Sequence, residues 1–153
     1  MSIHWNIKHY SELSLDEFHD LIQLRINVFV VEQNCPYSEL DGKDKQCFHL
    51  IGRDDKDNIA ATARILPFGL GYEHDVAIGR VVIGENHRGL QLGHALMREC
   101  KNFIAQHYGT VSIRLSAQKH LEKYYGQHDF VSTGKEYLED GIPHVEMLNK
   151  IKA

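Results

Sequence analysis

The chain has 153 residues, of which 25% are charged and 42% are hydrophobic, and its formal net charge is −4 with its 11 histidines neutral. This length suits one domain with a substantial core, and the composition is ordinary for a soluble globular protein, so we expect a single domain over residues 1–153. The acidic balance argues against a nucleic-acid partner, and no apolar run is long enough to suggest a membrane span.

The cysteines and the N-terminus indicate the compartment. Cys35, Cys47 and Cys100 are odd in number and lack Cys-x-x-Cys spacing, which favours reduced thiols over a disulfide framework or a zinc site. Residues 1–6 lack the basic and apolar regions of a signal peptide. We therefore expect a cytoplasmic protein that holds no metal.

The first predicted elements are a strand and a helix. Apolar and polar residues alternate over residues 3–8, which is the period of a half-buried strand. Ser14 and Glu17 then form a capping-box pattern, followed by apolar residues at intervals of three and four up to about residue 30. This pattern predicts a helix, and the acid-rich residues 34–44 after it predict a loop.

One charged residue of this helix is unusual. Arg25 lies on or near the apolar side of the predicted helix. A buried arginine requires a carboxylate partner, and we expect Glu32 or Asp41 to supply it.

The middle of the chain predicts three strands and a long helix. Residues 47–53 and 59–66 indicate two strands joined by a polar turn, and the β-branched residues 76–83 indicate a third. A helical pattern extends from residue 89 to about residue 107, and Gly109 is a plausible residue to end it.

The remaining elements complete a mixed fold. Residues 111–117 alternate as a strand, residues 118–128 predict a short helix, and residues 130–133 and 145–148 predict a closing pair of strands. The order β-α-β-β-β-α-β-α-β-β predicts an α/β fold with a mostly antiparallel sheet flanked by helices. The two-strand edge at the C-terminal end could support a homodimer.

The junction between the third middle strand and the long helix has the pattern of an anion site. A strand, a short loop and a helix aim free backbone N–H groups and the positive end of a helix dipole at one point. Gly89 and Gly93 let a ligand approach the backbone there, and a pyrophosphate would fit. The segment lacks the Lys-Ser/Thr ending of a P-loop and the glycine spacing of a dinucleotide-binding turn.

This junction resembles the acetyl-CoA loop of the GNAT acetyltransferases, whose pattern is Arg/Gln-x-x-Gly-x-Gly/Ala. Arg88, Gly89 and Gly93 match the family, whereas Gln91 stands where the family has a glycine. The departure removes no backbone N–H donor, but it narrows the room for the pyrophosphate.

A second segment is similar to the closing motif of the same family, Leu/Phe-Tyr-x-x-x-Gly-Phe. Tyr124 and Tyr125 correspond to the Leu-Tyr pair and Phe130 to the final Phe, while Asp129 replaces the glycine. Aspartate also adopts left-handed backbone geometry, so this replacement is tolerable. Gln118 stands where the family has an asparagine that contacts the cofactor.

The resemblance extends over nearly the whole chain. Residues 24–37, together with Glu39, Asp41, His49 and residues 140–144, resemble the ElaA-like branch of the family. Acyl-homoserine lactone synthases also carry the Val-Phe-Val-x-Glu-Gln run found here, so that run alone does not define the chemistry.

The resemblance implies an N-acetyltransferase that moves an acetyl group from acetyl-CoA to an amine by direct attack in a ternary complex. Tyr125 would protonate the departing thiolate. The implied cofactor-binding residues are Val81, Val82 and Ile83 along the pantetheine and acetyl group, Arg88, Gly89, Leu90, Gln91, Leu92, Gly93 and His94 around the pyrophosphate, and Gln118 and Tyr125. The alternatives are another acyl-CoA transferase, similar to acyl-homoserine lactone synthases, and a CoA-binding module without turnover.

The acceptor side is less defined. We expect an acceptor pocket lined by Glu32, Glu39, Asp41, His49 and His144. The general base could be any of these residues. An acidic pocket favours a cationic amine, such as a lysine side chain, a polyamine or a peptide N-terminus.

Overall fold

A computed structural model describes residues 2–89 and 91–149 of the chain. Within these residues, seven strands form one sheet in the order β1-β2-β3-β4-β5-β7-β6. The strands are β1 (His4–His9), β2 (Phe48–Arg53), β3 (Ile59–Leu66), β4 (Val76–Ile83), β5 (Ile113–Gln118), β6 (Val131–Glu139) and β7 (Ile142–Asn149). The helices are α1 (Leu15–Arg25), α2 (Leu92–Tyr108) and α3 (Glu122–Gly126). The predicted order of elements and the predicted fold class are confirmed.

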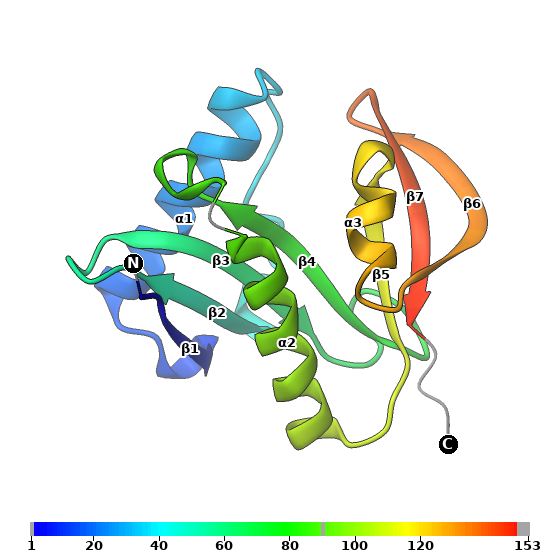
Figure 1. Cartoon of the computed structure of the whole chain (residues 1–153), viewed down its shortest axis with the longest axis horizontal. Coiled ribbons are helices and arrows are strands. Elements are labelled where there is room, and N and C mark those ends of the chain that lie inside the picture. Colours follow the sequence, from blue (N-terminus) through cyan, green and yellow to red (C-terminus); the bar gives the residue numbers. More distant parts are fainter. Residues whose placement is uncertain (1, 90, 150–153) are drawn as a thin grey trace.

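The sheet divides between β4 and β5. These two strands are the parallel pair, and they pair only at Val76 with Ile113 and at Ala77 with Arg114, whereas the other neighbours are antiparallel. Beyond this short contact the two strands diverge and the sheet opens as a V (Figure 1). Backbone groups that would otherwise pair across β4 and β5 are therefore free to meet a ligand.

Strand β4 is also irregular where it leaves β5. Thr62 pairs with Val82 and Arg64 with Gly79, so two residues of β4 oppose one residue of β3 in a β-bulge. Arg80 lies in this bulge with φ of 48°, a left-handed conformation that is uncommon for a residue with a side chain. The bulge therefore redirects the Arg80 side chain.

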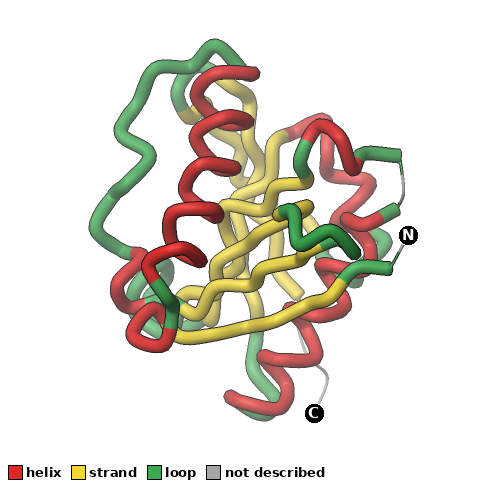
Figure 2. The backbone as a smooth tube through the Cα atoms, turned by 90° about the vertical axis from the view of Figure 1, so that its left-hand side faces the viewer, coloured by secondary structure: helices red, strands yellow, loops and turns green. Residues whose placement is uncertain are grey.

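Helices cover both faces of the sheet, with α2 on one side and α1 on the other (Figure 2). The main core joins the buried face of α2 to β2–β5 and β7, and it includes Leu96, Met97 and Ile104. A smaller cluster joins Leu24 and Val28 to Val82 of β4 on the opposite face. Strand β4 is therefore held from both sides.

Several predicted boundaries differ from the structure. The Ser14–Glu17 capping box begins α1 as predicted, but the α-helix ends at Arg25 and continues as a π-helix over Ile26–Glu32. The last two strands are longer than predicted, because the turn between them consists only of Asp140 and Gly141, both with positive φ. This two-residue turn has the geometry typical of a tight hairpin.

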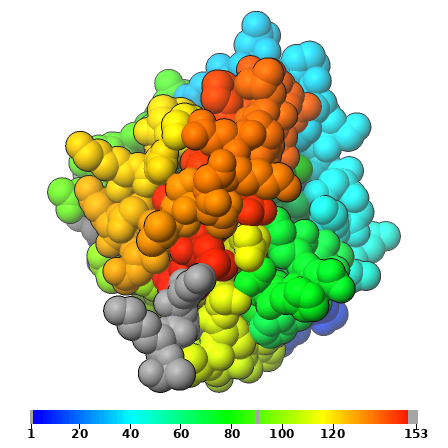
Figure 3. All heavy atoms as spheres, turned by 90° about the vertical axis from the view of Figure 1, so that its right-hand side faces the viewer, coloured from blue at the N-terminus to red at the C-terminus, as the bar shows by residue number. Residues whose placement is uncertain are grey.

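Strand β6 forms an outer edge of the sheet and is spread over the face seen in Figure 3. Val131 and Leu138 are exposed on this strand. The predicted homodimer at this edge stays a prediction.

The three cysteines are free thiols, and within residues 2–89 and 91–149 no helix is both long and apolar enough to cross a membrane.

Candidate active site

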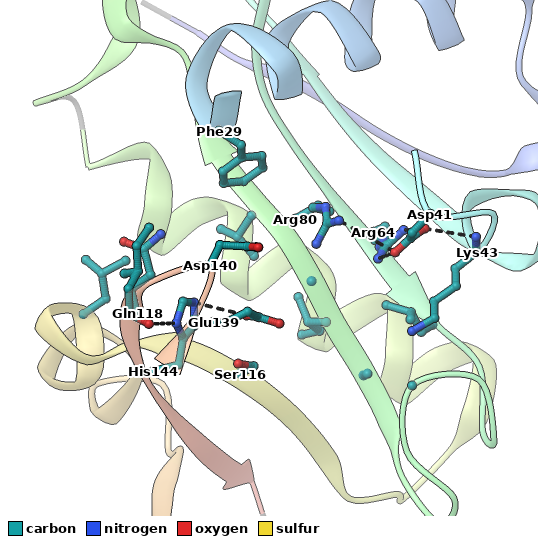
Figure 4. Close-up of a pocket in the computed structure, with 18 of the residues that line it drawn as sticks. Phe29, Asp41, Lys43, Arg64, Arg80, Ser116, Gln118, Glu139, Asp140 and His144 are labelled. Carbon is teal, nitrogen blue, oxygen red and sulfur yellow. Dashed lines mark hydrogen bonds and ion pairs between the residues drawn. The ribbon is translucent and has the colours of Figure 1, made fainter. Parts of the chain in front are cut away.

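The opening between β4 and β5 leads into a cavity of about 410 Å³. Its walls come from β3, β4 and β5, from the segment that follows the π-helix, and from the β6–β7 turn (Figure 4). Its lining residues include Arg80, Gln118, Tyr125 and His144. The cavity therefore lies where the free edge of β4 faces the C-terminal strands.

The N-terminus of α2 lies beside this opening and lacks a side-chain cap. The N-cap residue, Gln91, makes no capping hydrogen bond and has φ of 57° and ψ of 27°, the left-handed geometry that a glycine would favour. Gly89 precedes it with φ of 82°. Helix α2 has 17 residues, so its first N–H groups and dipole can bind an anion such as a phosphate. Leu90, predicted to bind the cofactor, lies outside the described residues.

Gly93 has a packing role besides its predicted ligand role. A Cβ at this position would lie 3.1 Å from the hydroxyl oxygen of Tyr124, and that hydroxyl donates a hydrogen bond of 2.6 Å to the Gly93 carbonyl. The glycine thus lets α3 approach the start of α2. On the same turn, His94 Nδ1 lies 2.8 Å from Nε2 of the buried His128.

Arg88, predicted to contact the pyrophosphate, is already paired. Its two terminal nitrogens donate to the Glu32 carboxylate at 2.6 and 2.7 Å, and its Nε donates to the Ile83 carbonyl at 3.2 Å. The hydrogen bonds from Arg88 lower the pKa of Glu32. Glu32 therefore lies at the loop between β4 and α2 and does not line the cavity.

Tyr125 lies on the wall of the cavity, and only 7% of its surface is exposed. Its ring packs against Tyr124 and Phe130, with ring centroids 4.8 and 6.2 Å apart. Burial raises the pKa of the Tyr125 hydroxyl, which therefore stays protonated at neutral pH and can donate a hydrogen bond. Asp129 adopts φ of 70°, so its expected left-handed geometry is confirmed.

The predicted cofactor residues of β4 point in two directions. Val81 and Ile83 pack against the main core, and Val81 also lines the cavity. Val82 packs instead into the cluster below α1, so only its backbone is available on the other face. Gln118 lines the cavity from the end of β5.

The five predicted acceptor residues do not converge on one pocket. Asp41 and His144 line the cavity, whereas Glu39 and His49 are buried behind it. His49 Nε2 lies 2.9 Å from the Asp44 carbonyl, and burial lowers the pKa of the His49 imidazole, so this histidine is neutral and structural.

Glu39 belongs to a largely buried group of charges that we call the ion cluster, of which Arg80 and Asp41 are the partly exposed members. The ion cluster consists of Arg25, Glu39, Asp41, Asp44, Arg64 and Arg80. Arg25 donates to Glu39 at 2.5 Å and to Asp44 at 2.8 Å, so the predicted partners Glu32 and Asp41 were wrong. Arg64 binds Asp41 at 2.7 Å instead. Three guanidinium groups balance three carboxylates, which is why these side chains tolerate burial.

Most polar residues of the cavity were not predicted from the sequence. They include Tyr37, Lys43, Arg64, Arg80, Ser116, Glu139 and Asp140. A signal existed for two of them, because Arg64 and Arg80 interrupt otherwise apolar strands. His144 was predicted, and its Nε2 lies 3.3 Å from the Glu139 carboxylate.

Comparison with known proteins places this site in a class. A family model described as an acetyltransferase (GNAT) domain matches residues 10–151. Protein ElaA of Escherichia coli is 40% identical over 151 residues, which cover 97% of each chain. The fold and the open cleft in its sheet are those of an acyltransferase.

Solved structures agree with this class. An acyl-CoA N-acyltransferase from Pseudomonas aeruginosa superimposes with a TM-score of 0.91 at 42% identity, covering 97% of this chain and 99% of that one. The crystal structure of Escherichia coli ElaA gives a TM-score of 0.90 at 38% identity, covering 97% of this chain and all of that one. The chain therefore belongs to the GNAT acetyltransferase family, in its ElaA-like branch.

Proposed function

We propose that the protein is an N-acetyltransferase that moves an acetyl group from acetyl-CoA to an amine by direct attack in a ternary complex. The observation that carries this proposal is the uncapped N-terminus of α2 beside the opening between β4 and β5. The helix N-terminus suits the pyrophosphate, and the free edge of β4 suits the pantetheine and the thioester. Gly89 and Gln91 supply the left-handed backbone that this loop requires.

The reaction needs two proton transfers. An alkylammonium has a pKa near 10.4, so the acceptor must lose a proton before attack. Glu139, Asp140 and His144 line the cavity and are candidates to receive that proton, directly or through water. The new C–N bond forms and the C–S bond breaks, and the departing sulfur takes a proton from the Tyr125 hydroxyl. The acetylated nitrogen loses its second proton, which returns to Tyr125 directly or through water.

The contribution of Tyr125 to the rate of acetyl transfer should be limited. Its pKa is raised by burial, which makes it a weak acid, and a thiol with a pKa of about 8.5 is already a fair leaving group. We therefore expect Tyr125→Phe to lower kcat by roughly 10- to 100-fold and to change the Kd for acetyl-CoA much less, because phenylalanine keeps the ring. Tyr108→Phe, at the far end of α2, is the matched control and should leave both quantities unchanged.

The test begins with calorimetric titration of acetyl-CoA into the wild-type protein, with adenosine as the comparison ligand. We expect one-to-one binding with a Kd in the micromolar range or below, and no binding of adenosine. CoA release is then followed spectrophotometrically with amine acceptors. If acetyl-CoA does not bind, the proposal fails. Binding without CoA release from any amine would favour a module without turnover.

The alternative of an acyl-homoserine lactone synthase rests on the shared Val-Phe-Val-x-Glu-Gln run and on the fold. The acyl-homoserine lactone synthase LasI superimposes with a TM-score of 0.80 but is only 15% identical. Competition by long-chain acyl-CoA distinguishes this alternative. If long-chain acyl-CoA does not displace acetyl-CoA, the result supports acetyl-CoA as the acyl donor.

A further inference from the structure

The acceptor cavity has side walls of opposite charge. We call Lys43, Arg64 and Arg80 its cationic wall, which also contains Asp41 as the ion-pair partner of both arginines. We call Glu139 and Asp140 its acidic wall. Figure 4 shows these groups on opposite sides of strand β4, with the acidic wall next to Gln118 and Ser116. A ligand that spans the cavity therefore meets both signs of charge.

The cationic wall has hydrogen-bond donors that are unpaired within the described residues. Arg80 uses its Nε and Nη2 on Glu39, at 3.0 and 3.4 Å, and its Nη1 has no partner among the described residues. The ammonium group of Lys43 likewise has no ion pair within the described part of the chain. The side chains of the ion cluster balance one another, so Lys43 leaves this wall with an excess positive charge.

Arg64 supplies an independent observation. It is only 4% exposed, and its Nε is the buried side-chain polar atom that lacks a hydrogen-bond partner within residues 2–89 and 91–149. A buried donor without a partner is costly, so such a group in a cavity wall indicates a missing acceptor atom. A carboxylate oxygen is the acceptor that a guanidinium binds best.

Gly79 leaves room for that oxygen. It lines the same cavity, and a Cβ at this position would lie 3.9 Å from Arg64 Nε and 3.7 Å from a methyl group of Leu66. Both distances are ordinary contacts, so an alanine would fit without strain. It would, however, occupy the space in front of the Arg64 donor.

The acidic wall can receive an ammonium group. The Asp140 carboxylate has no ion pair in the described part of the chain, and the Glu139 side chain is 56% exposed, with His144 at 3.3 Å as its partner. Glu139 is the last residue of β6, and Asp140 begins the hairpin turn. Their charge is therefore accessible from the cavity.

We propose that the acyl acceptor is a small primary amine that also carries a carboxylate. The carboxylate lies against the cationic wall over Gly79, and the amine is directed towards the acidic wall and Gln118. This inference rests on the proposed function and names its substrate class. It narrows the expectation of a purely cationic acceptor, because a diamine would leave Arg64 Nε without a partner and would meet the charge of Lys43.

The test compares amines that differ by one carboxylate. CoA release from acetyl-CoA is measured with the pairs lysine and cadaverine, ornithine and putrescine, and alanine and ethylamine. We expect at least one carboxylate-bearing amine to exceed its matched partner in kcat/KM by about tenfold or more. Equal or better turnover of the partners without a carboxylate would overturn the inference and leave the proposed function standing.

Three variants connect the preference to the cationic wall. Lys43→Met and Gly79→Ala should each bring the ratio of kcat/KM within the preferred pair towards one. Lys45→Met, exposed and two residues away but outside the cavity lining, should leave the ratio unchanged. The Kd for acetyl-CoA should be the same in all three variants, which separates lost recognition from lost folding. An unchanged ratio in both wall variants would overturn the inference, whereas CoA release from none of the six amines would overturn the proposed function itself.

Discussion

The two sides of strand β4 are stabilised by different interactions. On the side of the acidic loop, the six side chains of the ion cluster hold β3, β4 and α1 together through buried ion pairs. On the side of α2, the strand is held by apolar packing, and the N-terminus of the helix has no side-chain cap. The difference predicts that the ion-cluster side of β4 is sensitive to loss of charge, whereas the α2 side, where we propose that the cofactor binds, is sensitive to added side-chain atoms.

The largest effect should come from breaking the ion cluster. Arg25→Leu would leave Glu39 and Asp44 buried with fewer partners, and we expect a loss of about 3–5 kcal/mol in the free energy of unfolding. Urea denaturation measures this loss. Arg53→Leu removes a partly exposed pair with Asp20 and should cost no more than about 1 kcal/mol. Equal losses in the two variants would contradict the difference between the two sides.

A smaller effect is expected on the cofactor side. Gly93→Ala places a methyl group 3.1 Å from the Tyr124 hydroxyl and should lower the free energy of unfolding by about 1–3 kcal/mol. Acetyl-CoA affinity, measured by calorimetry, should fall as the start of α2 shifts. Gly126→Ala is the matched control, because a Cβ there meets no atom within 4 Å. An equal loss of acetyl-CoA affinity in Gly126→Ala would show that the loss in Gly93→Ala does not come from the contact with Tyr124.

The smallest effect is a pH dependence specific to the ion cluster. Hydrogen bonds from Arg64 lower the pKa of Asp41, and for Asp44 burial opposes ionisation but Arg25 and Arg64 outweigh it, so that its pKa is lowered too. A carboxyl with a lowered pKa stabilises the fold above its ordinary value of 3.8, and this stabilisation is lost as the pH falls.

The direction of this pH dependence can be measured by comparing the wild type with the Arg25→Leu variant. The urea midpoints of the wild type and of Arg25→Leu should lie far apart at pH 7 and approach each other as the pH is lowered towards 3. The comparison with the variant removes the contribution of other carboxylates with lowered pKa values, such as Glu17 and Asp75. A gap that stays constant over this range would show that the cluster carboxylates do not titrate as the structure indicates.

The sequence predicts the elements better than it predicts the partners. The alternation in β1 and the capping box of Ser14 and Glu17 are local patterns, and each led to the correct element. The partners of Arg25 follow from how the acid-rich loop folds back over α1. Glu39 and Asp44 lie 14 and 19 residues away, and no periodicity distinguishes them from Glu32 or Asp41.

The same limit applies to the candidate site. The family pattern located the loop at Gly89 and Gly93, but no pattern indicated that Tyr124 packs on Gly93. The cavity's charged walls depend on the bulge at Arg80 and on the turn at Asp140, which bring together residues of β3, β4 and β6. Such contacts arise from tertiary structure, so one sequence could not reveal them.

The Glu32–Arg88 pair bears on the order in which two substrates enter. Glu32 ends the π-helix, and Gln33, Cys35 and Tyr37 after it line the acceptor cavity. In the proposed complex, a phosphate that binds the Arg88 guanidinium competes with the Glu32 carboxylate for the same two terminal nitrogens. Once displaced, Glu32 no longer anchors the start of the segment that borders the acceptor. Under the proposed function, binding of the acyl donor would therefore release this segment before the acceptor binds, which predicts an ordered rather than a random sequence of substrate binding.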